Sequence, residues 1–96
     1  MTVALNSILS FYQIRNTLSE RQKAVAELLR DRNLTNREIA SLLGWEINTV
    51  TPRVKELRER GLVYEYGQKR DEQTGKTVTV WALKDEYKGR QDAFNF

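Results

Sequence analysis

Two short helices separated by a tight glycine turn are the feature that most constrains how this chain can fold. The first of them begins at Thr35, and Glu38 stands three residues later, which is the pattern of a capping box. Gly44 follows at the position where a left-handed residue commonly ends a helix, so it makes the turn into the next one. The predicted buried face of this first helix consists of Ile39, Leu42 and Leu43.

The helix after the turn is predicted to begin at Asn48 or Thr49 and to run to Arg60. Pro52 falls in the predicted first turn, where its missing N–H costs little because the first helical N–H groups have no partner within the helix. Gly61 closes the helix. Its apolar side chains recur at i, i+4 and i+7 and form one buried stripe, made of Val50, Val54 and Leu57.

A further helix precedes this pair. Ser19 and Gln22 have the spacing of a second capping box, and the helix that they start is expected to end near Arg32. Its apolar stripe contains Val25, Leu28 and Leu29. Residues 5–16 also carry apolar side chains at helical spacing, and we expect either a short helix or an extended arm there.

After Gly61 the hydrophobic period changes from that of a helix to that of a strand. Residues 62–66 and 77–83 are rich in β-branched and aromatic side chains and predict two strands. The polar stretch 67–76 between them predicts a hairpin with a long tip. Four aromatic residues are expected in the core rather than on a stacking surface: Trp45, Tyr64, Tyr66 and Trp81.

The spacing of small residues around the glycine turn favours a helix-turn-helix. Ala40 leaves room for a crossing helix, Gly44 lies four residues later, and Val50 follows Trp45 by five. The predicted fold is α+β and mostly α, with a three-helix core, a β-hairpin wing and an extra N-terminal helix or arm. Its expected parts are residues 1–18 (helix or arm), 19–83 (the domain) and 84–96 (a polar tail).

Residues 35–83 resemble a winged helix-turn-helix DNA-binding domain of the MarR-like kind, most clearly over residues 48–63. The segment 19–83 also resembles small winged-helix proteins encoded by phages and prophages. Two positions depart from the MarR-like pattern, because Pro52 stands where a polar or basic residue is usual and Arg53 where an apolar one is common. The long flanking dimerisation helices of that family are also missing, so a homodimer would have to form through residues 1–16 or the C-terminal tail.

In a fold of this kind the last helix lies in the major groove of DNA and its first residues meet the base edges. The resemblance therefore implies base or phosphate contacts from helix 48–60, through Asn48, Thr49, Thr51, Pro52, Arg53, Lys55 and Arg58. The preceding helix is expected to offer Asn36 and Arg37 to phosphates, since a helix N-terminus suits an anion. The wing, residues 67–76, is expected to reach the backbone or minor groove with Lys69, Arg70 and Lys76.

Each of these assignments has a plainer alternative that the residues themselves leave open. The cations of helix 48–60 alternate with Glu56 and Glu59, as they do on an ordinary solvated helix. Thr49 and Thr51 could serve only as helix caps. In the wing, Asp71 and Glu72 follow two cations, and the three cations and three acids of residues 62–83 cancel, so the wing could be a solvated hairpin tip.

Composition excludes several classes of function. The 96 residues include no Cys and no His, which removes disulfides, thiolate sites and the commonest metal ligand and general base. We expect no enzyme activity, no catalytic residues, no metal, no cofactor and no membrane contact, and we expect a cytoplasmic protein. The excess of +2 over residues 48–61, from four cations and two acids, favours an anionic partner.

These observations predict a sequence-specific double-stranded DNA-binding protein, and the resemblance implies a small transcriptional regulator of a phage or prophage. The alternative is a winged-helix adaptor that binds a host or phage protein in replication or host takeover. The small net charge of +3, the neutral wing and the aromatic C-terminal tail favour that alternative.

Overall fold

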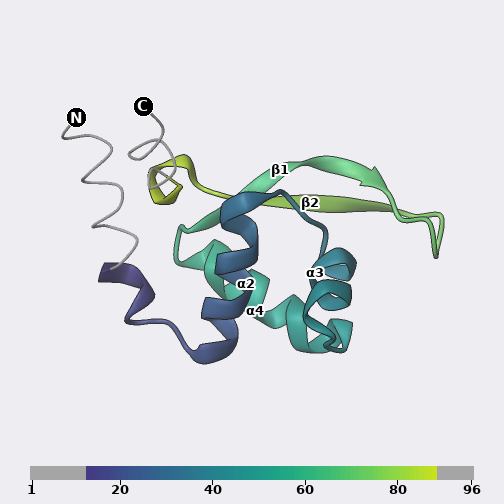
Figure 1. Cartoon of the computed structure of the whole chain (residues 1–96). Coiled ribbons are helices and arrows are strands. Elements are labelled where there is room, and N and C mark those ends of the chain that lie inside the picture. The colour runs from purple at the N-terminus through teal and green to yellow at the C-terminus, as the bar shows by residue number, and fades with distance from the viewer. Residues whose placement is uncertain (1–12, 89–96) are drawn as a thin grey trace.

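The computed structural model describes residues 13–88 (Figure 1). Three helices are followed by a two-stranded antiparallel hairpin and a short 3₁₀ helix. Residues 13–15 are helical, as expected, whereas residues 5–12 of the predicted N-terminal helix lie outside the described part. The elements are α2 (Glu20–Asp31), α3 (Asn36–Leu43), α4 (Ile47–Glu59), β1 (Val63–Arg70), β2 (Thr77–Leu83) and η1 (Asp85–Tyr87).

Both predicted capping boxes are confirmed. In α2 the Ser19 hydroxyl accepts from the backbone N–H of Gln22 at 3.2 Å, and the Gln22 side chain accepts from the backbone of Ser19 at 2.9 Å. Thr35 and Glu38 repeat this arrangement at α3 with the same two distances. Each box satisfies two N–H groups that have no partner within the helix, which is why these helices begin where they do.

The glycine turn is also confirmed, but α4 begins earlier than expected. Gly44 adopts the left-handed conformation with φ of +70°, and the N–H of Trp45 donates to the carbonyl of Ala40 at 2.9 Å. The N-cap of α4 is Glu46, which makes no side-chain cap, so the prediction that α4 starts at Asn48 or Thr49 was wrong. The idea that threonine side chains cap this helix is wrong for the same reason.

Pro52 consequently lies inside α4 rather than in its first turn. It is the sixth residue of the helix, so its missing N–H deprives the carbonyl of Asn48 of its usual helical donor. The far end of α4 follows the prediction: Gly61 has φ of +83°, and the N–H of Leu62 donates to the carbonyl of Leu57 at 3.0 Å. The chain then passes directly into β1.

The hairpin is longer in strand and shorter in loop than the sequence predicted. Ladder pairing continues to Arg70 opposite Thr77, which leaves a tip of residues 71–76 instead of 67–76. The second strand has the predicted bounds, but the end of β1 was missed because both faces of the projecting ribbon are exposed there, so its side chains do not alternate in burial. A bulge between Glu65 and Gly67 leaves Tyr66 61% exposed, and the expectation that Tyr66 belongs to the core was wrong.

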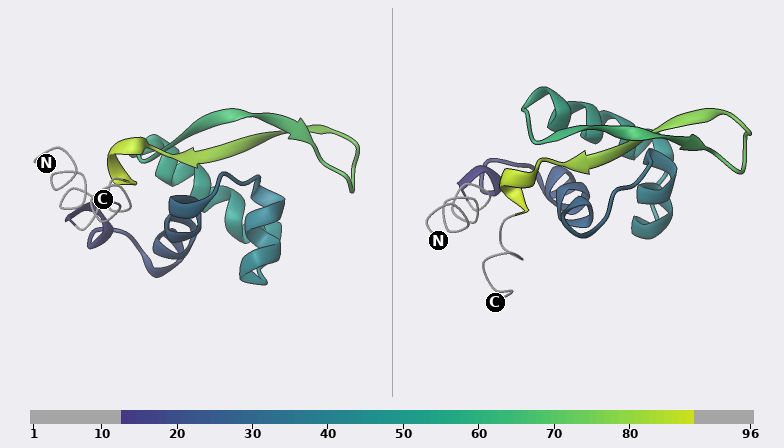
Figure 2. Two further views of the ribbon diagram at one scale, coloured as in Figure 1. Left: turned by 45° about the horizontal axis from the view of Figure 1, so that its top comes forward. Right: turned by 90° about the horizontal axis from the view of Figure 1, so that it is seen from above.

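The hairpin is anchored to the helices at its base. The segment between α2 and α3 joins the sheet through Leu34 and Trp81, whose backbones exchange hydrogen bonds of 3.0 and 2.8 Å. Figure 1 shows the hairpin lying along one side of the helices and its tip projecting past α3. Figure 2 shows the same projection in two further views, with the tip at the opposite end of the molecule from η1.

The core lies where the three helices meet the base of the hairpin. Its fully buried large side chains come from every element except η1: Val25, Leu29, Ile39, Val50, Val54, Leu57, Leu62, Val63 and Leu83. Trp45 and Trp81 pack partly buried against it. Leu42 is 51% exposed, which corrects its predicted burial, because the buried face of α3 is centred between Ile39, Ala40 and Leu43.

The segment after β2 also packs against the domain. The N–H of Lys84 donates to the carbonyl of Leu62 at 2.9 Å, and Tyr87 in η1 is partly buried against the core. Burial is the main reason that the pKa of the Tyr87 hydroxyl lies above its ordinary value. No helix in residues 13–88 is both long and apolar enough to span a bilayer.

Candidate nucleic-acid interface

A groove of about 440 Å³ runs between the first residues of α3 and α4 and the wing, which we define as β1, β2 and their tip. Two of the predicted contact residues from α3, Asn36 and Arg37, line this groove together with Lys76 of the wing. Ile47 of α4 lines it as well. The fold therefore brings the N-terminal ends of two helices and the wing to one concave surface, where helix N-termini favour a negatively charged ligand.

The exposed face of α4 extends from this groove. Asn48, Thr51, Pro52 and Lys55 are all exposed, while Thr49 and Arg53 are partly buried. The hydroxyl of Thr51 donates to the carbonyl of Ile47 at 3.1 Å and accepts from the Asn36 side-chain amide at 3.4 Å. This contact joins the beginning of α3 to α4, and the Asn36 side-chain oxygen is buried without a partner beside it.

Two ion pairs hold the wing against α3. Nε of Arg37 lies 2.9 Å from a carboxylate oxygen of Asp71, and Nζ of Lys69 lies 2.6 Å from one of Glu38. Glu38 serves two purposes, because its other carboxylate oxygen accepts from the backbone N–H of Thr35 in the capping box. Arg37 and Lys69, both predicted phosphate contacts, are therefore neutralised within the protein.

These contacts lower the pKa values of both carboxyl groups, that of Asp71 on the wing and that of Glu38 on α3. The pKa of Asp71 is lowered, first by the hydrogen bond from the Gln73 backbone and then by the one from Arg37. Partial burial alone would raise the pKa of Glu38, but hydrogen bonds from Lys69 and Thr35 outweigh it and lower that pKa. Because both values are lowered, the pairs persist above the ordinary carboxyl range and are lost as pH falls through the folded-state values.

We expect the substitution Asp71→Asn to loosen the wing tip without unfolding the domain. Asparagine can still accept from the Gln73 backbone, so the change removes chiefly the charge opposite Arg37. Backbone NMR order parameters of residues 72–76 should fall in the variant at neutral pH. In the unaltered protein they should fall only in acid, below the ordinary aspartate pKa of 3.8.

The matched control for this prediction is Glu72→Gln, which removes the same charge from an exposed residue of the same tip. Glu72 makes no ion pair within residues 13–88. Equal order parameters in the two variants would show that the Arg37–Asp71 pair does not hold the wing.

A second network joins α4 to α2. The guanidinium of Arg53 donates two hydrogen bonds, of 2.8 and 2.7 Å, to the carboxylate of Glu56. The side-chain amide of Gln22, which also completes the α2 capping box, donates to the same carboxylate at 2.8 Å. These hydrogen bonds, that from Arg53 first, lower the pKa of Glu56. Arg53 is therefore tied to its own helix.

Two further cations of α4 and its C-cap are also engaged. The guanidinium of Arg58 lies over the ring of Trp81, 5.9 Å from its centroid, which is within the range of a cation–π contact. Arg60 donates to the hydroxyl of Thr17 at 2.7 Å. The half of α4 that follows Lys55 is thus bound to the protein through its basic side chains.

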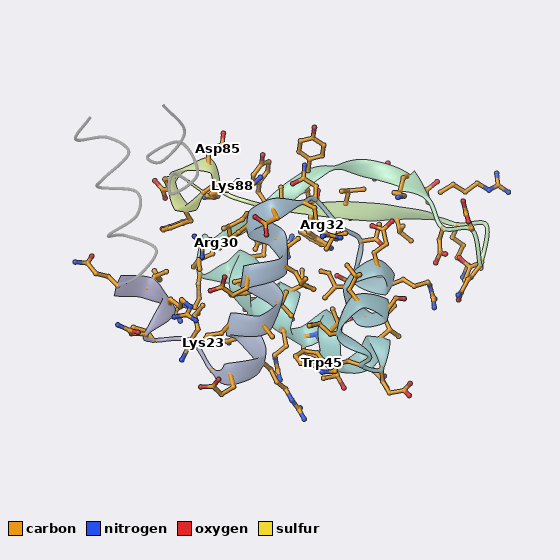
Figure 3. All side chains as sticks on the ribbon, in the orientation of Figure 1. Lys23, Arg30, Arg32, Trp45, Asp85 and Lys88 are labelled. Carbon is orange, nitrogen blue, oxygen red and sulfur yellow. The ribbon has the colours of Figure 1, made fainter. Side chains whose placement is uncertain are left out.

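Three of the predicted contact residues are cations with neither an ion pair nor a cation–π contact among residues 13–88: Lys55 on α4, and Arg70 and Lys76 on the wing. Lys76 lines the groove, Arg70 lies at the end of β1 on the same wing, and Lys55 lies on the exposed face of α4 that extends from the groove. Figure 3 shows that Lys23, Arg30 and Lys88, in contrast, lie toward the opposite end of the molecule from the wing tip.

Sequence reasoning missed several residues at this surface. The groove is lined by Ile47, which is 36% exposed, and by the wing residues Thr74, Thr77 and Thr79. Glu46 occupies the N-cap position of α4, although its side chain makes no cap hydrogen bond. Ile47 was assigned to the turn, although an apolar residue directly before a predicted helix could have drawn attention to it. Nothing in the sequence pattern distinguishes the threonines from those of any exposed strand.

Residues 21–64, which extend from α2 into β1, match the family model described as winged helix-turn-helix DNA-binding. The fold of the described residues is that of a winged helix-turn-helix domain. The matched segment includes the turn at Gly44, all of α4 and the start of the wing, so the fold class expected from the sequence is confirmed.

Several solved structures are similar to this fold. ZitR of Lactococcus lactis is 26% identical, with a TM-score of 0.59 over 79% of this chain and 50% of that one. Reduced AbfR bound to DNA is 25% identical, with a TM-score of 0.59 over 88% and 63%. The adhesin competence repressor AdcR of Streptococcus pyogenes, at 21% identity, has a TM-score of 0.58 over 92% and 66%.

The winged-helix chain spans about half the length of the ZitR chain, so the parts of ZitR beyond the shared domain have no counterpart in the match. No curated protein matches the sequence significantly.

Proposed function

We propose that this winged-helix protein binds double-stranded DNA in a sequence-specific manner and acts as a small transcriptional regulator. The observation that carries the proposal is the groove, where the N-terminal ends of α3 and α4 meet the wing beside cations that have no partner in the described part of the protein. In this arrangement α4 enters the major groove, and the wing follows the backbone or the adjacent minor groove.

The similarity to the AbfR structure that contains DNA supports the same proposal. We expect two kinds of contact with DNA, one to phosphates and one to base edges. Lys55, Arg70 and Lys76 are free to neutralise phosphates, while Asn48 and its neighbours at the start of α4 face base edges. Arg37, Arg53, Arg58 and Lys69 would contribute mainly by fixing α3, α4 and the wing relative to one another.

The experiment that tests the proposal is fluorescence anisotropy of the full chain with a randomised duplex pool, from about 50 to 200 mM salt, followed by sequencing of the bound fraction. We expect binding that weakens linearly on a log–log plot against salt and that enriches one motif. An absence of binding at the lowest salt would overturn the proposal and favour the protein–protein adaptor, for which the exposed Leu42 and Ile47 offer apolar contacts.

The substitution Lys55→Ala should weaken binding to the enriched site by about 1–3 kcal/mol if Lys55 reads a base. If Lys55 contacts only a phosphate, specific and random duplexes should lose affinity equally, and the salt slope should decrease by about 1. The comparison is made with Lys23→Ala, at the far end of the molecule from the wing tip. An affinity equal to that of this control would remove Lys55 from the interface.

The symmetry of the enriched DNA motif reports whether the protein binds as a dimer or as a monomer. A palindromic site would support the predicted homodimer through residues 1–16 or 84–96, because half-site symmetry mirrors protein symmetry, and an asymmetric short site would support a monomer. Most of both segments lies outside the described residues. A phage or prophage origin stays a prediction of the sequence resemblance.

A further inference from the structure

The exposed beginning of α4 has one cation, and this cation is engaged within the protein. Between Glu46 and Val54 the sequence has a single basic residue, Arg53, which is partly buried and whose Nε and Nη2 donate to the carboxylate of Glu56. Guanine shows two acceptors, N7 and O6, in the major groove, and proteins read it best with a paired donor from arginine or lysine. The part of α4 that would meet base edges first therefore offers guanine only the partly buried, ion-paired Arg53.

The residues that are exposed there suit a different base pair. Asn48 makes no side-chain hydrogen bond within the described residues, so its amide is free to donate to N7 and accept from N6 of adenine. Ile47 and Pro52 are apolar and exposed, and apolar side chains contact the thymine methyl group. The Thr51 hydroxyl is used within the protein, which leaves its methyl group for the same purpose.

The acid at the N-cap is a further acceptor. Glu46 is exposed, makes no cap and has no ion pair in the described part of the chain. Its carboxylate only accepts hydrogen bonds, so it can accept from the amino group of adenine or cytosine and offers no donor to guanine. We propose that the first two turns of α4 read a short run of A·T base pairs through the major groove, with Asn48 on an adenine and Ile47 and Pro52 on thymine methyl groups.

This inference rests on the proposed DNA binding and adds the class of site. It is tested with the motif that the full chain enriches. We expect consecutive A·T pairs at the centre of each recognised element. The variant Asn48→Ala should lose roughly 5- to 150-fold discrimination at one of those pairs, the range of a single bidentate base contact. Asn33→Ala, on the segment between α2 and α3, is the matched control and should leave the motif unchanged.

A second variant tests the same face by gain of function. Pro52→Arg places a guanidinium beside Asn48. Position 52 is exposed, so the substitution removes only the proline ring from the helix. We expect the enriched motif to change from A·T to G·C at one position. This result does not depend on the fold tolerating Asn48→Ala, and far-UV circular dichroism reports whether each variant is folded.

A·T runs also narrow the minor groove, which attracts basic side chains such as those of the wing. Replacing thymine by deoxyuridine in the enriched duplex separates the two explanations, because it removes only the major-groove methyl group. The inference requires a several-fold loss of affinity on that duplex, and an unchanged affinity overturns the thymine contacts.

The failures are distinguishable. If the native chain shows no salt-dependent binding to any duplex, the proposed function fails and the inference fails with it. If it binds and enriches a motif with G·C pairs at the centre, or if Asn48→Ala and Pro52→Arg leave the motif unchanged, the proposed function stands and the inference is overturned.

Discussion

Replacing Leu57 by alanine is expected to lower the free energy of unfolding by about 2–5 kcal/mol. Leu57 is fully buried on α4, which packs against α2, α3 and β1, so the cavity left by the substitution lies at the centre of the domain. A small domain is stable by only about 5–15 kcal/mol, and this one change would remove a large share of that. Urea denaturation followed by circular dichroism measures the loss.

The control for Leu57→Ala is Leu42→Ala, which removes the same atoms from a side chain that is 51% exposed on α3. We expect a cost within about 0.5 kcal/mol there, as for most surface substitutions. Equal losses in the two variants would mean that α4 is not the central helix of the core.

The second large effect is expected on DNA affinity. Replacing Lys55, Arg70 and Lys76 together by alanine should reduce the slope of log affinity against log salt by about 3, since each phosphate contact contributes about 0.9. At 0.1 M salt this corresponds to roughly two to three orders of magnitude in affinity. None of the three side chains makes an ion pair in residues 13–88, so the domain should stay folded.

A second triple variant, in which Lys23, Lys84 and Lys88 become alanine, matches the loss of charge. Lys23 and Lys88 lie toward the end of the molecule opposite the wing tip, and Lys84 is adjacent in sequence to η1 (Figure 3). A similar decrease in slope from this control would show that overall charge, and not the surface of α4 and the wing, governs binding.

The sequence predicted which residues of α4 are exposed, but not which of the cations have partners within the protein. Asn48, Thr51 and Pro52 lie exposed on α4 as the resemblance implied, because the Val50, Val54 and Leu57 stripe turns them away from the core. Arg37, Arg53 and Lys69 were equally good phosphate contacts by composition. Their partners are found only in the folded chain, and for Arg37 and Lys69 those partners are 34 and 31 residues away in sequence.

The sequence by itself determined where α2 and α3 begin, where the chain turns at Gly44 and where α4 ends at Gly61. These features depend on hydrogen bonds and dihedral angles that span only a few residues, so local side chains specify them.

Only the tertiary structure decided what Gln22 and Glu38 contact besides completing their capping boxes. Gln22 donates to Glu56 on α4, and Glu38 accepts from Lys69 of the wing. The tertiary structure also decided that Leu42 stays outside the core and that β1 continues to Arg70. The physical reason is that these outcomes depend on which surfaces far apart in the sequence come into contact. Side-chain periodicity does not reveal such contacts, and it also fails to mark a strand whose two faces are both exposed.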